Sequence, residues 1–235
     1  MIQQKAWIRV IALAEVLLCS GLPTQVAIAV LLAAIGIAPR DADGLSLAFV
    51  AVLSLADTAT LVVLMVALTR SHGDSPRALW IGDRPAGREA LIGLSLTPVV
   101  VVLVVLAFGS LRLFAPWLHN VEVNPLEELA TRGAGEAALV GLVAIVAGGV
   151  REEMQRAFML HRFERHLGGP AVGVAVLSVG FGLGHALQGW DAVVATAGLG
   201  VLWAIVYLRR RSTLAPIVSH ACFNALEVLR VAIGG

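Results

Sequence analysis

Residues 89–114 read EALIGLSLTPVVVVLVVLAFGSLRLF, and the 22 residues between Glu89 and Arg112 carry no charged side chain. A run of about 20 mostly apolar residues lets one helix cross the hydrocarbon core of a bilayer. The rest of the chain is similar, because 58% of its 235 residues are hydrophobic and 14% are charged, with a mean hydropathy of +0.87. Soluble domains carry about a quarter charged residues. The sequence therefore predicts an integral membrane protein.

Further apolar segments predict an all-α fold, a polytopic transmembrane helix bundle of about seven spans with a range of six to eight. We expect one transmembrane domain over 1–235, with spans at 7–37, 44–69, 89–114, 134–160, 170–189, 192–208 and 213–232. The first span is too long for one straight helix and contains Gly21-Leu22-Pro23, which predicts a kink or two short pieces. Asn124 followed by Pro125 predicts the start of a short helix before the fourth span.

Positive charges alternate between the loops. The N-terminus and the loops at 70–88, 161–169 and 209–212 hold eleven Lys and Arg residues, whereas the intervening loops hold Arg40 and Arg132. Because Lys and Arg favour the cytoplasmic side, seven spans with a cytoplasmic N-terminus are expected. The expected location is the bacterial plasma membrane. The net charge of +1 gives no basic excess for nucleic acid.

Three polar clusters interrupt the apolar spans, where ionisable groups cost at least about 2.5 kcal/mol and are functional candidates. The first is Arg151-Glu152-Glu153-Met154-Gln155-Arg156, in which Glu152 and Arg156 are spaced to pair on one helix face. The second is Phe181-Gly182-Leu183-Gly184-His185, whose glycines permit close approach of a neighbouring helix or a substrate backbone. The third is His220-Ala221-Cys222-Phe223-Asn224, with two polar side chains on one face.

A carboxylate, two imidazoles and an amide in a dry pocket suit hydrolysis of a peptide bond. A buried Glu accepts a proton from water, one His orients that water, and the second His with Asn donates hydrogen bonds to the oxyanion. The same side chains, Glu152, His185 and His220, form an alternative zinc ligand set. Other buried charges read as structural contacts: Asp57 and Glu15 as hydrogen-bonded links between helices, and Glu227 with Arg230 as a pair.

These residues resemble the CAAX protease and bacteriocin-processing (CPBP) family of intramembrane endopeptidases, whose motifs are Glu-Glu-x-x-x-Arg, Phe-x-x-x-His and His-x-x-x-Asn. Phe181 and His185 match the second motif, and His220 and Asn224 match the third. The resemblance covers about 145–228, the expected catalytic core. It implies a glutamate-dependent protease without a cofactor, acting on a membrane-embedded or lipidated peptide, with Glu and His185 activating water.

The first motif departs from the pattern, because only Met154 and Gln155 separate Glu153 from Arg156. Aligning Arg156 puts Arg151 in the place of the first Glu; aligning Glu152 as that Glu brings Arg156 one residue early. We favour Glu152 as the base, since a one-residue helical shift, by a π-bulge near Gly148-Gly149 for instance, would rotate it inward, and Glu153 is the alternative.

Two other function classes stay open. Glu152, His185 and His220 could serve as titrating sites of a transporter or proton relay, and the shifted motif is compatible with a catalytically inactive scaffold or immunity protein. Depth sets a further condition on the protease, because His185 lies about fifteen residues into its span, roughly 22 Å, and His220 about half as deep. The fifth span therefore has to begin below the membrane surface or tilt strongly.

Overall fold

The computed structural model describes residues 2–42 and 44–234, with the side chains of Ile2 and Lys5 excepted. The regular secondary structure of these residues is helical apart from one hairpin of two-residue strands, in which β1 (Arg40–Asp41) pairs antiparallel with β2 (Gly44–Leu45). The α-helices are α1 (Ile2–Leu18), α2 (Leu22–Ala34), α3 (Leu47–Ser71), α4 (Pro76–Trp80), α5 (Ala86–Phe114), α6 (Pro125–Thr131), α7 (Ala134–Val143), α8 (Glu152–His166), α9 (Pro170–Leu183), α10 (Trp190–Arg210) and α11 (Leu214–Gly234). Two short 3-10 helices, Pro116–Leu118 and Ala186–Gln188, and a π-helix, η2 (Ala144–Arg151), complete the secondary structure.

Five continuous helical segments among the described residues are long and apolar enough to cross a membrane: α3, α5, the α7–η2–α8 segment, α10 and α11. The broken first span, α1 with α2, is a sixth candidate, bent by 42°. The predicted interruption at Gly21-Leu22-Pro23 is thus confirmed, since Gly21 adopts a left-handed φ of 90° and Pro23 lies in the first turn of α2. The expected all-α, polytopic architecture is confirmed with it.

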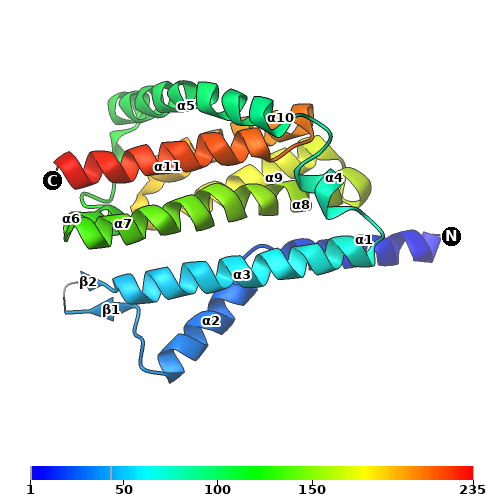
Figure 1. Cartoon of the computed structure of the whole chain (residues 1–235), viewed down its shortest axis with the longest axis horizontal. Coiled ribbons are helices and arrows are strands. Elements are labelled where there is room, and N and C mark those ends of the chain that lie inside the picture. The colour runs from blue at the N-terminus through cyan, green and yellow to red at the C-terminus, as the bar shows by residue number, and fades with distance from the viewer. Residues whose placement is uncertain (1, 43, 235) are drawn as a thin grey trace.

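The expected full span at 170–189 is wrong. Helix α9 has 14 residues and ends at Leu183, so it measures about 21 Å, shorter than a hydrocarbon core of about 30 Å. A 3-10 turn, Ala186–Gln188, follows and leads into α10. Helix α9 and this turn together return the chain from the end of α8 to the start of α10 (Figure 1).

The N-terminus and the segments at 70–88, 161–169 and 209–212, which carry most of the Lys and Arg residues, lie at one end of the bundle (Figure 1). We call this the basic end. Ion pairs there join Arg165 to Asp74 at 3.0 Å and Arg211 to Glu164 at 2.7 Å. At the opposite end, Asn120 accepts a hydrogen bond from the backbone of Trp190, and the N- and C-termini lie at different ends (Figure 1). The positively charged segments that alternate along the sequence therefore lie at the same end of the fold. The assignment of this end to the cytoplasm stays a prediction.

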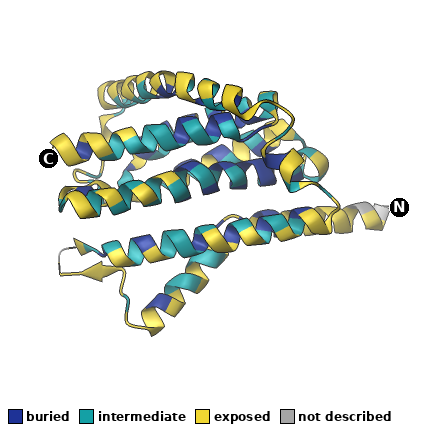
Figure 2. Cartoon of the chain, viewed as in Figure 1, coloured by how far each residue is buried: buried dark blue, intermediate teal, exposed yellow. Residues whose placement is uncertain are grey.

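Helix α11 lies between α5 and the α7–α8 segment, and α3 and α1 lie beyond that segment (Figure 1). One hydrophobic cluster joins α3 and α8 through Leu61, Met65 and Phe158, and a second joins α5 to α10 through Val100 and Trp203. The outer faces of α5 and α2 remain exposed (Figure 2). Their exposed side chains are mostly apolar, as lipid-facing surfaces require, and the exposed Arg88 and Arg112 lie in the first and last turns of α5.

Asn124 caps α6 by accepting a hydrogen bond from the backbone N–H of Leu126 at 3.1 Å, with Pro125 at the first helical position, so the predicted short helix is confirmed. Arg230 pairs with Glu227 at 3.0 Å, as expected. Glu15 links α1 to His72 and to Arg162 of α8.

Candidate active site

The first polar cluster begins where a π-helix becomes an α-helix. Segment η2 ends at Arg151, and α8 begins at Glu152, so the helical irregularity anticipated near Gly148-Gly149 is present. Two glycines in η2 let α11 approach closely, because a Cβ at Gly149 would lie 2.6 Å from the Cβ of Ala221 and one at Gly148 would lie 2.5 Å from Nδ2 of Asn224. This approach puts the glutamates beside the third motif.

Glu153 is the more buried of the two glutamates, with 2% of the residue exposed. Its carboxylate forms an ion pair with Arg156 and accepts a hydrogen bond from Nδ1 of His220 at 2.8 Å. The expected pairing of Glu152 with Arg156 is therefore wrong. Arg156 faces the bundle interior, with its guanidinium over the ring of Phe181 at 4.7 Å, and Glu153, three residues before it, is the carboxylate on that face.

Glu152 is less enclosed, and 20% of its side chain is exposed. Oε1 of Glu152 pairs with Nη2 of Arg151 at 3.2 Å, whereas Oε2 lies 4.0 Å from Nε2 of His220. This separation is short enough for one water oxygen to form hydrogen bonds of about 2.8 Å to both atoms. His220 therefore has one glutamate bonded to Nδ1 and the other facing Nε2.

The ring of His220 is fixed from two directions. It stacks on the indole of Trp203 with centroids 3.8 Å apart and an interplanar angle of 17°, while Glu153 accepts the bond from Nδ1. A carboxylate partner on one nitrogen sets the orientation of the ring and leaves Nε2 for a reacting group. Asn224, one helical turn along α11, donates from Nδ2 to the carbonyl of Ala144 at 2.9 Å, and its amide carries a second N–H donor.

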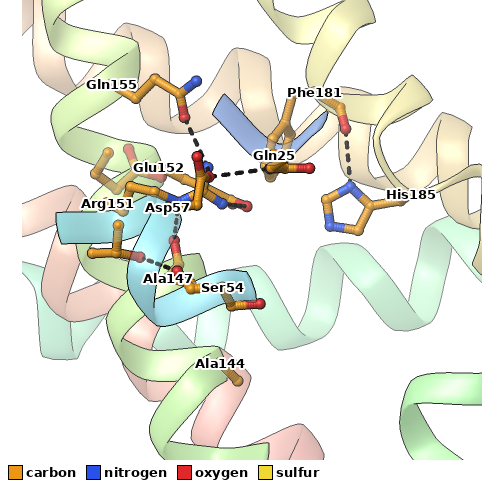
Figure 3. Close-up of polar contacts among 12 residues, drawn as sticks. Gln25, Ser54, Asp57, Ala144, Ala147, Arg151, Glu152, Gln155, Phe181 and His185 are labelled. Carbon is orange, nitrogen blue, oxygen red and sulfur yellow. Dashed lines mark hydrogen bonds and ion pairs between the residues drawn. The ribbon is translucent and has the colours of Figure 1, made fainter. Parts of the chain in front are cut away.

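The second motif ends in a turn, because His185 lies after the last residue of α9. Nδ1 of His185 is 2.9 Å from the carbonyl oxygen of Phe181 (Figure 3). Because a carbonyl oxygen only accepts, Nδ1 carries the proton and Nε2 of the neutral ring holds a lone pair. Among the described residues, no hydrogen bond or ion pair joins His185 to Glu152 or Glu153.

The phenyl ring of Phe181 brings the three motifs together. Its centroid lies 4.9 Å from the ring of His185 and 6.0 Å from that of His220, in edge-to-face contact with both. Arg156 of the first motif covers one face of the same ring. The condition on depth is met at this ring, because Phe181 of α9 and His220 of α11 contact each other.

The close approach expected of the glycines in the second motif is also observed. A Cβ at Gly182 would lie 2.5 Å from the carbonyl oxygen of Val193 and 2.9 Å from the Cβ of Ala197. The neighbour is therefore helix α10. This contact fixes the end of α9 that carries Phe181 and His185.

The alternative zinc site is not assembled by these side chains. Within residues 2–42 and 44–234, no group of three or more His, Cys, Asp or Glu side chains is arranged to hold a metal ion. His220 turns Nδ1 toward Glu153 and His185 turns Nδ1 toward a carbonyl oxygen. The set Glu152, His185 and His220 does not converge on one point.

Sequence reasoning missed two groups of partners. Trp203 stacks on His220 from an apolar helix in which no local pattern distinguishes it. Gln155, inside the first cluster, and Asp57, in the second span, both contact the guanidinium of Arg151. Asp57 was expected to link helices, and its bond partners on α2 and η2 agree with that expectation.

Residues 133–226 match the family described as type II CAAX prenyl endopeptidase, Rce1-like. The matched segment contains all three motifs. The comparison with curated proteins found no match, and neither did the comparison with solved structures.

Proposed function

Because residues 133–226 form a domain of the Rce1-like type II CAAX prenyl endopeptidase family, we propose that the chain is an intramembrane endopeptidase of the glutamic type. The observation that carries this proposal is the convergence of Arg156, His185 and His220 on the ring of Phe181. Three motifs from separate helices thereby surround one buried region of the bundle, beside a pair of glutamates.

The geometry supports Glu152 as the general base. Glu153 already has Arg156 and His220 as partners and is closed off from water. Within the described part of the chain, Oε2 of Glu152 has no bonded partner of this kind and lies 4.0 Å from Nε2 of His220. A positioned base of this kind contributes about 10²- to 10⁴-fold to a hydrolytic rate.

His185 is proposed to orient the attacking water. The lone pair on Nε2 accepts one O–H of that water while Glu152 takes the proton of the other. Hydrogen bonds of this kind often tighten only when substrate is bound, which is compatible with the present separation of His185 from the glutamates. The nucleophilic oxygen then bonds to the carbon of the peptide carbonyl.

His220 and Asn224 are proposed as the oxyanion donors. In its imidazolium form His220 donates through Nδ1 to Glu153 and through Nε2 to the oxyanion, and Asn224 contributes an N–H of its amide. Collapse of the intermediate breaks the C–N bond, and the protonated Glu152 returns its proton to the leaving amine. The immediate products are a carboxylic acid, whose hydroxyl keeps the second proton of the water, and a neutral amine, so the proton balance closes.

The proposed substrate is a peptide that reaches the site from the bilayer, such as a prenylated CAAX peptide or another membrane-associated peptide. The family description supports the prenylated class, and the apolar outer faces of the bundle support delivery through lipid. We propose the bacterial plasma membrane as its location.

The test uses purified full-length protein in liposomes with a farnesylated peptide that ends in a CAAX sequence. Glu152→Gln, His185→Ala and His220→Ala should each reduce kcat by at least about 10²-fold, with normal yield and size-exclusion profile. The matched control is Glu227→Gln, which removes an exposed ion pair two turns beyond His220 on the same helix and should cleave at the wild-type rate.

Glu153→Gln separates the two glutamates. It should weaken folding as well as cleavage, because it leaves Arg156 buried without its counter-ion. Cleavage at the wild-type rate by all of Glu152→Gln, Glu153→Gln, His185→Ala and His220→Ala would overturn the proposed mechanism. A variant Glu153→Gln that folds normally and is inactive, beside an active Glu152→Gln, would transfer the role of base to Glu153.

A further inference from the structure

Arg151 occupies the position at which one alignment of the motif expects the first Glu, and its guanidinium is buried against four partners. Nε donates to the carbonyl of Ala147 at 3.3 Å, and Nη1 donates to Asp57 and to Gln155, each at 3.4 Å. Nη2 pairs with Glu152 at 3.2 Å. Only 11% of the side chain is exposed, so these contacts replace its hydration.

The partners of Arg151 are themselves held by the broken first span, as Figure 3 shows for the contact between Gln25 and Asp57. Asp57 accepts hydrogen bonds from the hydroxyl of Thr24 and, at 3.2 Å, from Gln25, both at the start of α2. Gln155 donates to the carbonyl of Cys19 at the end of α1, at 2.6 Å. The network therefore joins α8 to both sides of the break between α1 and α2.

The break also faces Arg151 directly. Gly21 lies in the break with a left-handed φ of 90°, and a Cβ there would lie 3.5 Å from Nη1 of Arg151. A continuous helix through this position would carry side chains toward the guanidinium and would keep its own carbonyl groups bonded internally. The interruption frees the carbonyl of Cys19 to accept from Gln155.

The two carboxylate oxygens of Glu152 have different neighbours. Oε1 faces Arg151 at 3.2 Å, and Oε2 faces Nε2 of His220 at 4.0 Å. A glutamate side chain otherwise samples several rotamers. The bond to Oε1 therefore selects the rotamer that presents Oε2 to the position of the attacking water.

We propose that Arg151 is a positioning residue for Glu152, held in place by Asp57, Gln155 and the break in the first span. This inference rests on the proposed function. It assigns to segments outside residues 133–226, the part matched by the family, a contribution to the active site. It also assigns a specific role, the positioning of Glu152, to Arg151 in the irregular first motif.

The test measures kcat and KM of full-length protein in liposomes with the farnesylated CAAX peptide, together with Tm. Asp57→Asn removes the counter-ion with little change of shape and should lower kcat about tenfold at unchanged KM. Arg151→Gln should lower kcat about 10²-fold, the loss expected for a displacement of about 1 Å at a reacting group. Arg151→Lys keeps the charge and should recover part of that loss.

Two controls separate positioning from a general loss of stability. The double variant Asp57→Asn/Arg151→Gln should cleave no more slowly than Arg151→Gln alone, because both changes interrupt one chain of contacts. Glu164→Gln breaks a comparable ion pair with Arg211 at the basic end and should leave kcat unchanged. If Arg151→Gln fails to fold, Asp57→Asn and Arg151→Lys carry the test.

The outcomes for the inference and for the proposed function differ. Loss of cleavage in Glu152→Gln with wild-type kcat in Arg151→Gln and Asp57→Asn overturns the positioning role alone. A lower Tm without a lower kcat per folded molecule does the same. Wild-type cleavage by Glu152→Gln together with the other three site variants overturns the proposed function instead.

Discussion

The contact between η2 and α11 makes a strong prediction, because it is closer than side chains normally allow. In the variant Gly149→Ala, the new methyl group would lie 2.6 Å from the Cβ, 2.7 Å from the Cα and 3.0 Å from the N of Ala221. Two of these atoms belong to the backbone, so a change of rotamer cannot relieve the overlap. Helix α11 has to move away from η2.

The size of the effect follows from ordinary contact distances. Carbon atoms pack at about 3.5–4.0 Å, so α11 has to withdraw by about 1 Å. His220, which precedes Ala221, moves with it, and its 2.8 Å bond to Glu153 stretches beyond the range of about 3.2 Å for a hydrogen bond. Overpacking of this kind costs about 1–3 kcal/mol, and a displacement of about 1 Å at a reacting group costs about 10²-fold in rate.

The assay compares kcat toward the farnesylated peptide and Tm in detergent. Gly135→Ala is the matched control, because its methyl group would meet no atom of the described chain within 4 Å, and it should cleave normally. The double variant Gly149→Ala/Ala221→Gly removes one of the three crowded atoms and should recover part of the activity. If Gly149→Ala cleaves at the wild-type rate with an unchanged Tm, the close approach of η2 and α11 does not hold the site together.

Further measurements address other parts of the chain. At the basic end, burial raises the pKa of Asp74, but the hydrogen bonds and charges of His161 and Arg165 outweigh it and leave the pKa below its ordinary 3.8. The stabilisation is therefore complete above a pH of about 4 and disappears as the pH falls through the folded pKa, so the Tm difference between wild type and Asp74→Asn should shrink toward zero in acid; a constant difference would contradict this. Phe181→Leu removes the ring beneath Arg156 and should lower kcat about tenfold at constant fold, since aromatic and cation–π contacts contribute about 0.5–1.5 kcal/mol each; an unchanged kcat would show that the ring is dispensable. Treatment with 1,10-phenanthroline should leave cleavage unchanged, and stoichiometric zinc that is required for activity would refute the glutamic mechanism.

The sequence predicts the fold well where composition alone decides it. The uncharged stretch between Glu89 and Arg112 becomes α5, and the Gly21-Leu22-Pro23 element breaks the first span. The length of α9 was not predictable in the same way, because the apolar stretch that starts at Pro170 continues past the end of the helix and is interrupted only by Ser178, His185 and Gln188. The helix stops near Gly182 and Gly184, where helix propensity is poor and where α10 packs against the backbone.

In the site, too, the local spacing of residues was predictable from the sequence, whereas the partners that come from other helices were not. Spacing predicts that Arg156 can reach a glutamate on its own helix, but residues three and four positions away are equally accessible. The choice of Glu153 depends on Phe181 and His220, which arrive from α9 and α11. Asp57 and Trp203 acquire their partners across the bundle, and a single sequence holds no signal for such contacts.

The missing residue in the first motif can be interpreted from the ion pair that forms. In the family pattern the second Glu and the Arg are four positions apart, and in this chain Glu153 and Arg156 are three apart, yet both spacings place the two side chains on one helix face. Glu153 forms that pair here, so it corresponds in space to the second Glu. Glu152 then corresponds to the first, the position that the resemblance associates with catalysis. The π-helix that ends at Arg151 supplies a change of helical phase immediately before this point, and the guanidinium of Arg151 lies against Oε1 of Glu152 rather than in the space facing His220. The pairing thus favours the alignment in which Glu152 is the base over the one in which Arg151 has replaced it.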